Sequence, residues 1–379
     1  MPPLKVAICG GGRTGHLNAA LFKQRPGVQV SLLTANRQLL GARCGGLEIT
    51  AHLPDGQNLG AHLDVVSDRP EHALDDADIV IITVPAHARP TLLRSIAASL
   101  PTDKPVYLGA IPGFCGFDWL AEKAMGDRRN IVIWGMKDVP HTAYDLQPGK
   151  SIRMGGAKNR LHVATHSQED EQARLRLLGH LQALYDAPID LLHHYLEITL
   201  TPGNPIMHSS VLYGLVGPYG QYCGRAFPAP ICWWTECPEL GAYFLERTDQ
   251  ENQTLCRAIE RSLNIDLSSV KPLKQEIIEA YGDMIGDRST MLSVLRTNRA
   301  YDSIRAPMVR VGDGKGYVID TMSRAFQEDV GHGLSLLVKL ARRLEIRLPY
   351  IEEIHAWGTR YMGGSGHAAR DYLPDDWPR

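Results

Sequence analysis

The stretch KVAICGGGRTG, residues 5–15, decides the fold of the N-terminal half because an apolar run leads directly into a glycine-rich turn. Residues 5–9 have the composition of a buried parallel strand, and residues 16–23 place apolar side chains at helical spacing. The glycines between them follow the pattern G-x-G-x-x-G, which permits a tight turn, close backbone approach to a pyrophosphate and close helix–strand packing. A tight strand-to-helix turn without a ligand is the simpler alternative. We predict a dinucleotide site that includes Gly10, Gly11, Gly12, Arg13, Thr14 and Gly15.

The rest of the N-terminal half alternates strand-like and helix-like segments, which predicts a doubly wound parallel sheet. Asp55-Gly56 separates two short strand-like segments and predicts a hairpin inserted into this alternation. Further strands are expected at 28–33, 79–84, 106–110, 131–134, 161–165 and 190–194, and helices at 37–40, 90–100 and 170–185.

The character of the chain changes near Leu200, where helical segments are separated by glycine and proline. Residues 246–263 and 330–344 carry apolar side chains at helical spacing. The expected fold class is therefore α/β, with an N-terminal doubly wound Rossmann domain over residues 1–197. A mainly α-helical second domain follows over residues 198–379.

Composition excludes several classes of function. The 379 residues carry a formal net charge of −2 with acids and bases interleaved, so no basic face predicts binding to nucleic acid or to an anionic membrane. No run of apolar residues is long enough to span a bilayer. The seven cysteines form no C-x-x-C pair, which favours reduced thiols, a cytoplasmic location and no metal site. A homodimer is compatible with the sequence, which does not determine the oligomeric state.

The residues after the second expected strand bear on the choice of nicotinamide cofactor. An acidic residue at this point usually binds the ribose of NAD, whereas a nearby arginine suits the 2′-phosphate of NADP. The chain has Thr34, Asn36 and Arg37 here and no carboxylate, so we expect NADP(H), with NAD(H) as the alternative. Arg37 as a surface residue of the next helix is the simpler interpretation. Val84 and Pro85, at the end of the strand expected at 79–84, complete the predicted cofactor site.

Two segments of the C-terminal half carry candidate chemistry. Asn204 followed by Pro205 predicts the N-cap and first residue of a helix, with His208 one turn inside it. In the segment SRAFQEDVGHGL, Glu328 and Asp329 are expected just before a helix, where either would cap the N-terminus. Arg324 would pair with them or bind a substrate carboxylate. On spacing alone, a structural histidine and a capping carboxylate are the simpler interpretations.

These segments together resemble the opine dehydrogenases, the family that contains octopine and nopaline dehydrogenases. The resemblance extends over most of the chain, through CGGGRTGH, the DG hairpin, IVIITVPAHA, IPGFCGF, the His208 segment, RTNRAYDSIRAP and RAFQEDVGHGL. The family usually has proline after the histidine and two residues after the aspartate. This chain has Ser209 and Gly331 at those positions, departures that leave both functional side chains in place.

The resemblance implies a reductive condensation. In this family an amine joins an α-keto acid such as pyruvate or 2-oxoglutarate, and hydride from the nicotinamide reduces the resulting imine to an opine. His208 and Asp329 match the family's proton relay, and Arg324 matches the position that binds the carboxylate of the amino acid. Imidazole titrates near neutrality, and a carboxylate on its second nitrogen would fix the tautomer.

The substrate site is expected next to the nicotinamide, at the carboxyl ends of the strands. Phe114 follows one of these strands, and Asp138 and His141 follow the next. Asn204 is included in the expected substrate site. An acid at 138, where relatives that take simple amino acids carry an uncharged polar residue, suggests a basic or aminated amine, as in relatives that build opine-type metal chelators. A simple ion pair of Asp138 with Lys137 is the alternative.

Two other functions remain open. A ketopantoate or β-hydroxyacid reductase would use a lysine one helical turn from an asparagine, and the segment around Asn204 has no lysine. A non-catalytic redox sensor that binds NADP would tolerate loss of His208.

Overall fold

The computed structural model describes residues 2–36, 47–201, 203–312, 314, 316–364 and 372–378. Arg37 and the short helix expected at 37–40 therefore lie outside the described residues. The chain forms two compact units, residues 1–199 and 200–379, each of which is described by itself.

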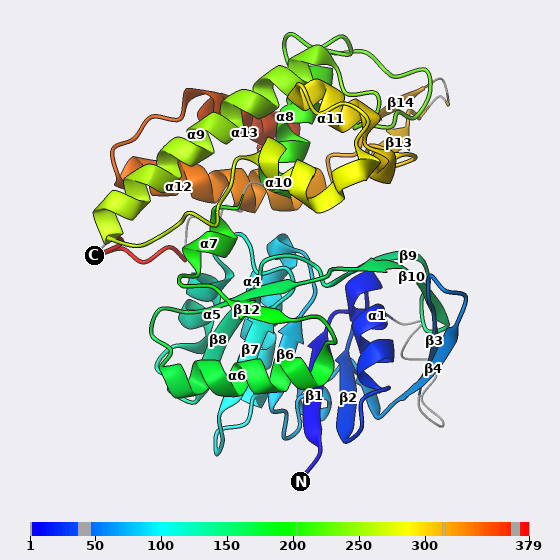
Figure 1. Ribbon diagram of the computed structural model, residues 1–379, viewed down its shortest axis with the longest axis vertical. Helices are drawn as coiled ribbons and strands as arrows, with labels where there is room; N and C mark the ends of the chain where they lie inside the picture. Colours follow the sequence, from blue (N-terminus) through cyan, green and yellow to red (C-terminus); the bar gives the residue numbers. More distant parts are fainter. Residues whose placement is uncertain are drawn as a thin grey trace. The chain divides into compact units, whose positions relative to one another are not determined.

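The first unit is built on a sheet that, in the described part of the chain, has eight strands in the order β12-β11-β8-β7-β6-β1-β2-β5 (Figure 1). Its strands are β1 (Leu4–Cys9), β2 (Val28–Leu33), β5 (Val65–Ser67), β6 (Ile79–Ile82), β7 (Val106–Ala110), β8 (Ile131–Met136), β11 (Leu161–Thr165) and β12 (Ile189–Leu191). The strands from β5 to β8 run parallel, as expected of a doubly wound Rossmann sheet. β11 pairs antiparallel with β8, so the sheet is not parallel throughout.

The strand order creates a switch point between β1 and β6, since the chain continues from β1 to β2 on one side and returns to β6 on the other. In sheets of this kind, ligands bind at the carboxyl ends of the strands beside the switch point. The connecting helices are α1 (Arg13–Phe22), α3 (Pro70–Ala73), η1 (Ala86–Ala88), α4 (Arg89–Ile96), η2 (Ala97–Ser99), α5 (Phe117–Met125), α6 (Glu171–Leu184) and α7 (Leu196–Thr199).

A second, four-stranded sheet is made by two insertions into the Rossmann alternation, in the order β4-β3-β10-β9. The predicted hairpin is confirmed as β3 (Leu47–His52) and β4 (Asn58–Leu63). The second hairpin, β9 (His141–Gln147) and β10 (Ser151–Ala157), is not predicted by the sequence. All four strands pack against α1, which explains why α1 is buried on nearly every face.

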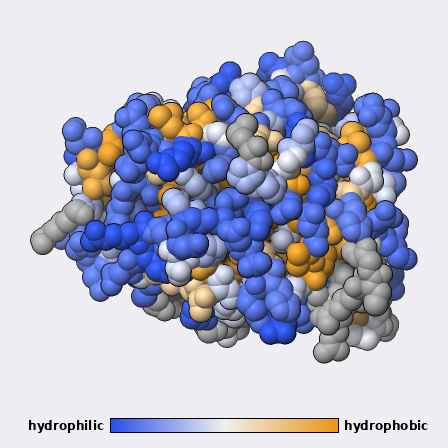
Figure 2. Space-filling model, turned by 90° about the horizontal axis from the view of Figure 1, so that it is seen from below, coloured by the Kyte–Doolittle hydropathy of each residue, from blue (hydrophilic) through white to orange (hydrophobic). Residues whose placement is uncertain are grey.

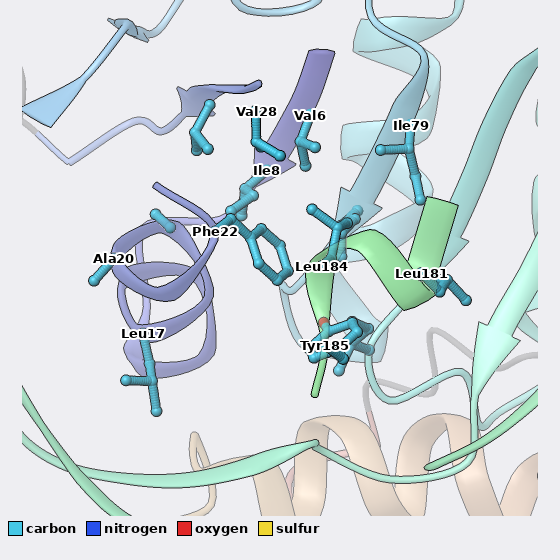
Figure 3. Packing of buried hydrophobic residues seen from close by; sticks show 14 of the residues in the cluster. Val6, Ile8, Leu17, Ala20, Phe22, Val28, Ile79, Leu181, Leu184 and Tyr185 are labelled. Carbon is cyan, nitrogen blue, oxygen red and sulfur yellow. The ribbon is translucent and has the colours of Figure 1, made fainter. Parts of the chain in front are cut away.

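The core of the first unit continues from the sheet to the end of α1. Figure 3 shows Phe22, the last residue of α1, beside Leu184 and Tyr185 at the end of α6. The Phe22 and Tyr185 rings meet edge to face with their centroids 5.3 Å apart, a favourable arrangement for two aromatic rings. The side of α1 that faces the main sheet is thereby fixed at both ends.

The second unit is mainly helical, as expected. Its elements are α8 (Asn204–Val216), α9 (Glu239–Leu263), α10 (Leu273–Tyr281), η3 (Gly282–Met284), α11 (Met291–Thr297), η4 (Arg299–Tyr301), β13 (Met308–Arg310), β14 (Tyr317–Ile319), η5 (Ala325–Leu334), α12 (Ser335–Arg343) and α13 (Pro349–Tyr361). α8 packs against α9, α13 and η5, and its residues 209–216 are all buried. A helix that is apolar on all sides belongs in the centre of such a bundle.

Two helix starts differ from the expectation. The helix expected at 330–344 begins at Ala325, because its first ten residues form the π-helical segment η5, so Asp329 lies inside the helix and does not cap it. α8 has Gly203 at its N-cap, with Asn204 as its first residue and exposed. In each case the residue that was expected to cap the helix is part of the helix itself.

Figure 2 shows mostly hydrophilic side chains on the visible face, with hydrophobic groups scattered among them. Of the helices in the described ranges, none combines the length and the apolar character needed to cross a bilayer.

Candidate active site

The glycine-rich turn joins β1 to α1 at the switch point. Gly10 has φ +137°, and a Cβ there would lie 2.4 Å from the hydroxyl oxygen of Thr83, so no larger residue fits. A Cβ at Gly15 would lie 1.9 Å from the carbonyl oxygen of Gly10, which fixes the close packing of helix on turn. A Cβ at Gly12 would meet no protein atom within 4 Å, so Gly12 is not required by packing.

The N-terminus of α1 fits a bound diphosphate. No side chain caps it, and its first turn has no acidic residue. Free backbone N–H groups and the positive end of the helix dipole favour an anion at such a position. Gly12 leaves room for close approach, so the residues of this turn fit the phosphates of a dinucleotide, with Gly11, Arg13 and Thr14 at its rim.

His16 connects this turn to the second sheet and was not singled out by sequence reasoning. Its imidazole is fully buried, with Nδ1 donating to the Gly12 carbonyl at 3.0 Å and Nε2 accepting from the Gly149 N–H at 3.1 Å. Burial lowers the pKa of His16, which is consistent with this neutral, singly protonated ring. The β9–β10 hairpin is thereby held against the glycine-rich turn.

The three described residues after β2, Thr34 to Asn36, leave the choice of cofactor open. Thr34 is buried, and its hydroxyl oxygen accepts a hydrogen bond from the Asn36 N–H at 3.1 Å. Neither residue carries a charge. Arg37, which was expected to bind the 2′-phosphate, lies outside the described residues.

Val84 lies two residues after β6 and neighbours the turn, since a Cβ at Gly10 would lie 3.1 Å from its side chain. Pro85, the next residue, is half-buried. The Val84 carbonyl also accepts from the side chain of Arg89, whose guanidinium is buried and donates to the carbonyls of Pro112 and Phe114, each at 2.8 Å.

Arg89 therefore joins the loop after β6 to the loop after β7. The Phe114 ring lies 5.4 Å from the guanidinium carbon, and this ring contact gives Phe114 a defined position at the carboxyl end of β7. Sequence reasoning missed Arg89, because an arginine at the start of a short helix usually lies on the surface.

Asp138 and His141 do not gather with Phe114. Asp138 forms a half-exposed ion pair with Lys158 at 2.8 Å. The His141 ring lies 6.0 Å from that of Tyr185, at the end of α1 opposite the glycine-rich turn, where both residues line a cavity of about 510 Å³. Burial lowers the pKa of His141 to about 4. These surroundings argue against contact of His141 with a keto acid beside the nicotinamide.

The pair His208 and Asp329 lies within the second unit. His208 projects from α8 and Asp329 from η5, and imidazole Nδ1 is 2.7 Å from carboxylate Oδ2. The carboxylate is 1 % exposed and the imidazole 17 %. Nε2 makes no hydrogen bond to any residue in the described ranges. Burial raises the pKa of Asp329, and the attraction of His208 opposes that shift.

This arrangement suits proton transfer. A carboxylate bonded to Nδ1 orients the ring and stabilises its protonated form, while Nε2 remains able to exchange a proton with a substrate. One face of the imidazole stacks on the indole of Trp233, with ring centroids 4.4 Å apart and an angle of 19° between the planes. The ring is therefore held at its edge and on one face.

Arg324 pairs with Glu328, one of its two expected partners. Its guanidinium bonds the Glu328 carboxylate, with Nε at 3.0 Å from Oε1. Glu328 is fully buried, whereas the Arg324 side chain is 55 % exposed. Part of the guanidinium therefore faces solvent one turn from Asp329, where a substrate carboxylate can approach it.

Comparison with known proteins gives consistent matches. Residues 191–362 match the family model described as NAD/NADP octopine/nopaline dehydrogenase, alpha-helical domain. The uncharacterised protein y4xO of Sinorhizobium fredii is 54 % identical and covers 99 % of both chains. Tauropine dehydrogenase of Arabella iricolor is 26 % identical, over 94 % of this chain and 91 % of that enzyme.

Among solved structures, octopine dehydrogenase with NADH and L-arginine superposes with a TM-score of 0.83 at 24 % identity, over 95 % of this chain and 90 % of that chain. A second structure of that enzyme, with NADH and pyruvate, superposes with a TM-score of 0.79 at 22 % identity, over 95 % and 89 % of the two chains. At this identity the likeness shows the shared fold. With the matched helical domain and the near full-length relatives, it places the chain in the opine dehydrogenase family of NAD(P)-dependent oxidoreductases.

Proposed function

We propose that this protein condenses an α-keto acid with the amine of an amino acid or amino-acid-derived compound and reduces the imine to an opine. The observation that carries the proposal is the His208–Asp329 pair, with Nδ1 bonded to a buried carboxylate and Nε2 without a hydrogen bond to any described residue. Release of water from the adduct and protonation of the new secondary amine both need a group that titrates near neutrality.

In this reaction His208 exchanges protons through Nε2. It takes a proton from the ammonium group of the amine substrate as the carbinolamine forms, and it returns that proton to the hydroxyl that leaves as water when the iminium forms. Asp329 accepts the Nδ1–H throughout and stabilises the imidazolium, which makes it a partner of the catalytic base. Pairing with a charged imidazole offsets the cost of keeping this carboxylate ionised at a site where burial raises its pKa.

The turn at residues 10–15 holds the cofactor diphosphate, with Val84 and Pro85 beside it. When bound, the reduced nicotinamide supplies the hydride. We propose NADPH as the preferred cofactor, because the residues that follow β2 carry no carboxylate and Arg37 comes next in the sequence. The family description names both NAD and NADP, so NADH is the alternative.

We assign the carboxylate of the amine substrate to Arg324, supported by its half-exposed guanidinium one turn from Asp329. The keto acid is pyruvate or 2-oxoglutarate, with Phe114 at its site and Asn204 at the start of the helix that carries His208. The arginine and pyruvate complexes of octopine dehydrogenase support these substrate classes. We also propose that the enzyme works in the cytoplasm as a homodimer. Size-exclusion chromatography, which measures the oligomeric state, tests the homodimer.

The deciding experiment follows NADPH absorbance with the purified protein. Pyruvate or 2-oxoglutarate is supplied alone and then with arginine, taurine, histidine or a diamino acid, and the product is identified by mass. We expect oxidation that depends on both substrates and a product heavier than the amine by the reduced keto-acid unit. Oxidation with keto acid alone would instead indicate a β-hydroxyacid or ketopantoate-type reductase. Tight NADPH binding with no turnover on any pair would indicate a sensor.

A further inference from the structure

His208 lies against a group of aromatic rings from a segment that has no regular secondary structure. Trp233 stacks on the imidazole at 4.4 Å, and Trp234 lies 5.5 Å from it at 24°. The two indoles stack on each other at 4.7 Å. Trp234 in turn contacts Tyr301, with centroids 5.8 Å apart. The three rings are therefore mutually adjacent, and the imidazole lies nearest to the indole of Trp233.

The polar atom of Trp233 plays no part in this contact. The residue is 5 % exposed, and its indole nitrogen is buried with no hydrogen-bond partner in the described part of the chain. A buried N–H without a partner costs free energy, so a phenylalanine or leucine would fill the space more favourably if packing were the requirement. Indole does offer the most strongly attractive aromatic face for a cation.

The charged side chains around His208 make other contacts, so the attraction for a cation at the face of its ring is left to the indole. Asp329 occupies Nδ1, and its neighbours Glu328 and Arg324 on η5 are bonded to each other. On α13, Glu353 bonds Tyr213, which lies further along α8 than His208. The carboxylate acts at the edge of the imidazole, and Trp233 is the nearer of the two indoles that stack on the ring.

We propose that Trp233 is a positioning residue for His208: its indole face fixes the plane of the imidazole and stabilises the protonated ring. The inference rests on the proposed function, because a protonated His208 is an intermediate of that reaction. It adds the residue that holds the ring so that Nε2 keeps one direction while Nδ1 stays on Asp329. A sequence cannot show this, since Trp233 and His208 belong to separate segments.

The first test is spectroscopic and does not require turnover. Protonated imidazole quenches the fluorescence of an indole stacked on it, so wild-type emission should fall as the pH drops through the titration range of histidine. His208→Gln should remove this step, and Trp233→Phe should remove most of its amplitude. The control is Trp357→Phe, because Trp357 is buried in the same unit and contacts Tyr213, Phe326 and Tyr361 but not His208. This control should keep the step.

The second test is kinetic. Trp233→Leu should lower kcat about ten-fold and Trp233→Phe two- to three-fold, with KM for the amine within two-fold of wild type. In both variants the acidic limb of the pH–rate profile should move to lower pH, whereas Trp357→Phe leaves the profile in place. Both variants, Trp233→Leu and Trp357→Phe, should lose stability, because both tryptophans are buried. A change in the pH profile that occurs only in Trp233→Leu is therefore not an effect of reduced stability.

The outcomes distinguish the two proposals. A fluorescence step that survives in His208→Gln, or a Trp233→Leu enzyme with the wild-type pH profile, overturns the role of Trp233. A His208→Gln enzyme that loses the step but keeps full turnover instead overturns the proposed reaction, while the stacking itself stands.

Discussion

Gly333 of η5 lies against the ring of Pro205 in the first turn of α8, so closely that a Cβ at Gly333 would be 2.4 Å from ring carbons of the proline. This contact lies one turn from both members of the His208–Asp329 pair, on the two elements that carry them. The distance between imidazole and carboxylate therefore depends on an approach of backbones that glycine alone permits.

Gly333→Ala should separate α8 from η5 and disturb this pair. We expect a loss of about 1–3 kcal/mol in the free energy of unfolding from overpacking, together with a clear fall in kcat. Urea denaturation and steady-state kinetics measure both. The matched control is Gly331→Ala in the same segment, where the added Cβ would lie 3.5 Å from its nearest neighbour. Equal behaviour of the two variants would show that the Pro205 contact does not set the geometry.

Gly12→Ala should weaken cofactor binding without affecting the fold. Gly12 has φ −88°, which alanine adopts readily, and the added Cβ would meet no protein atom within 4 Å. We expect the Kd for NADPH to rise at least ten-fold, with the free energy of unfolding within about 0.5 kcal/mol of wild type. Gly15→Ala, whose Cβ would lie 1.9 Å from a backbone oxygen, should instead destabilise the first unit. Unchanged NADPH affinity in Gly12→Ala would place the diphosphate elsewhere.

Removal of the His208–Asp329 pair should abolish turnover and spare the cofactor. His208→Gln and Asp329→Asn should each lower kcat by about 10²-fold or more, which is the usual contribution of general acid–base catalysis. NADPH affinity, measured by calorimetry, should stay within two-fold, because the glycine-rich turn belongs to the other unit. Full activity in either variant would exclude the proton relay.

Asp249 on α9 should make stability depend on pH. Its carboxylate is buried and accepts from the Leu273 N–H at 2.9 Å, and burial raises its pKa to about 6. The unfolded chain has an ordinary carboxyl pKa near 3.9, so the folded state binds more protons between these values. Stability should therefore fall as the pH rises from about 4 to 6.

Asp249→Asn keeps the acceptor oxygen and removes the charge. We expect this variant to be more stable than wild type by about 1–3 kcal/mol at pH 8 and equal to it at pH 4. Chemical denaturation at the two pH values gives the difference. Glu246→Gln, an exposed change one turn earlier on α9, is the control and should have the same small effect at both. A gain for Asp249→Asn that persists at pH 4 would rule out ionisation as its cause.

The central strands could be predicted from sequence because they are buried on both faces and consist of continuous apolar runs. Val106–Ala110, which is buried throughout, matches its predicted bounds for this reason. β9 and β10 could not be predicted. They are polar and partly exposed, and β10 pairs with β3, which is far away in the chain.

The candidate site was predictable to a similar degree. The glycine spacing indicates the turn, and the resemblance to opine dehydrogenases singles out His208 and Asp329. The role of Arg89 was not predictable, since its partners are backbone carbonyls of two other loops. The early start of η5 was hidden as well, because π-helical hydrogen bonding has no distinct apolar period.

The parallel pairing of β3 with β10, in register from Thr50 opposite Ser151, has a consequence for biosynthesis. The ribosome must deliver the chain through residue 157 before the small sheet can be completed. Until then, the outer side of the helix that follows the glycine-rich turn lacks half of its cover. We therefore expect nascent chains arrested before β9 to be cleaved by protease within residues 13–22, and chains arrested after β10 to be protected there.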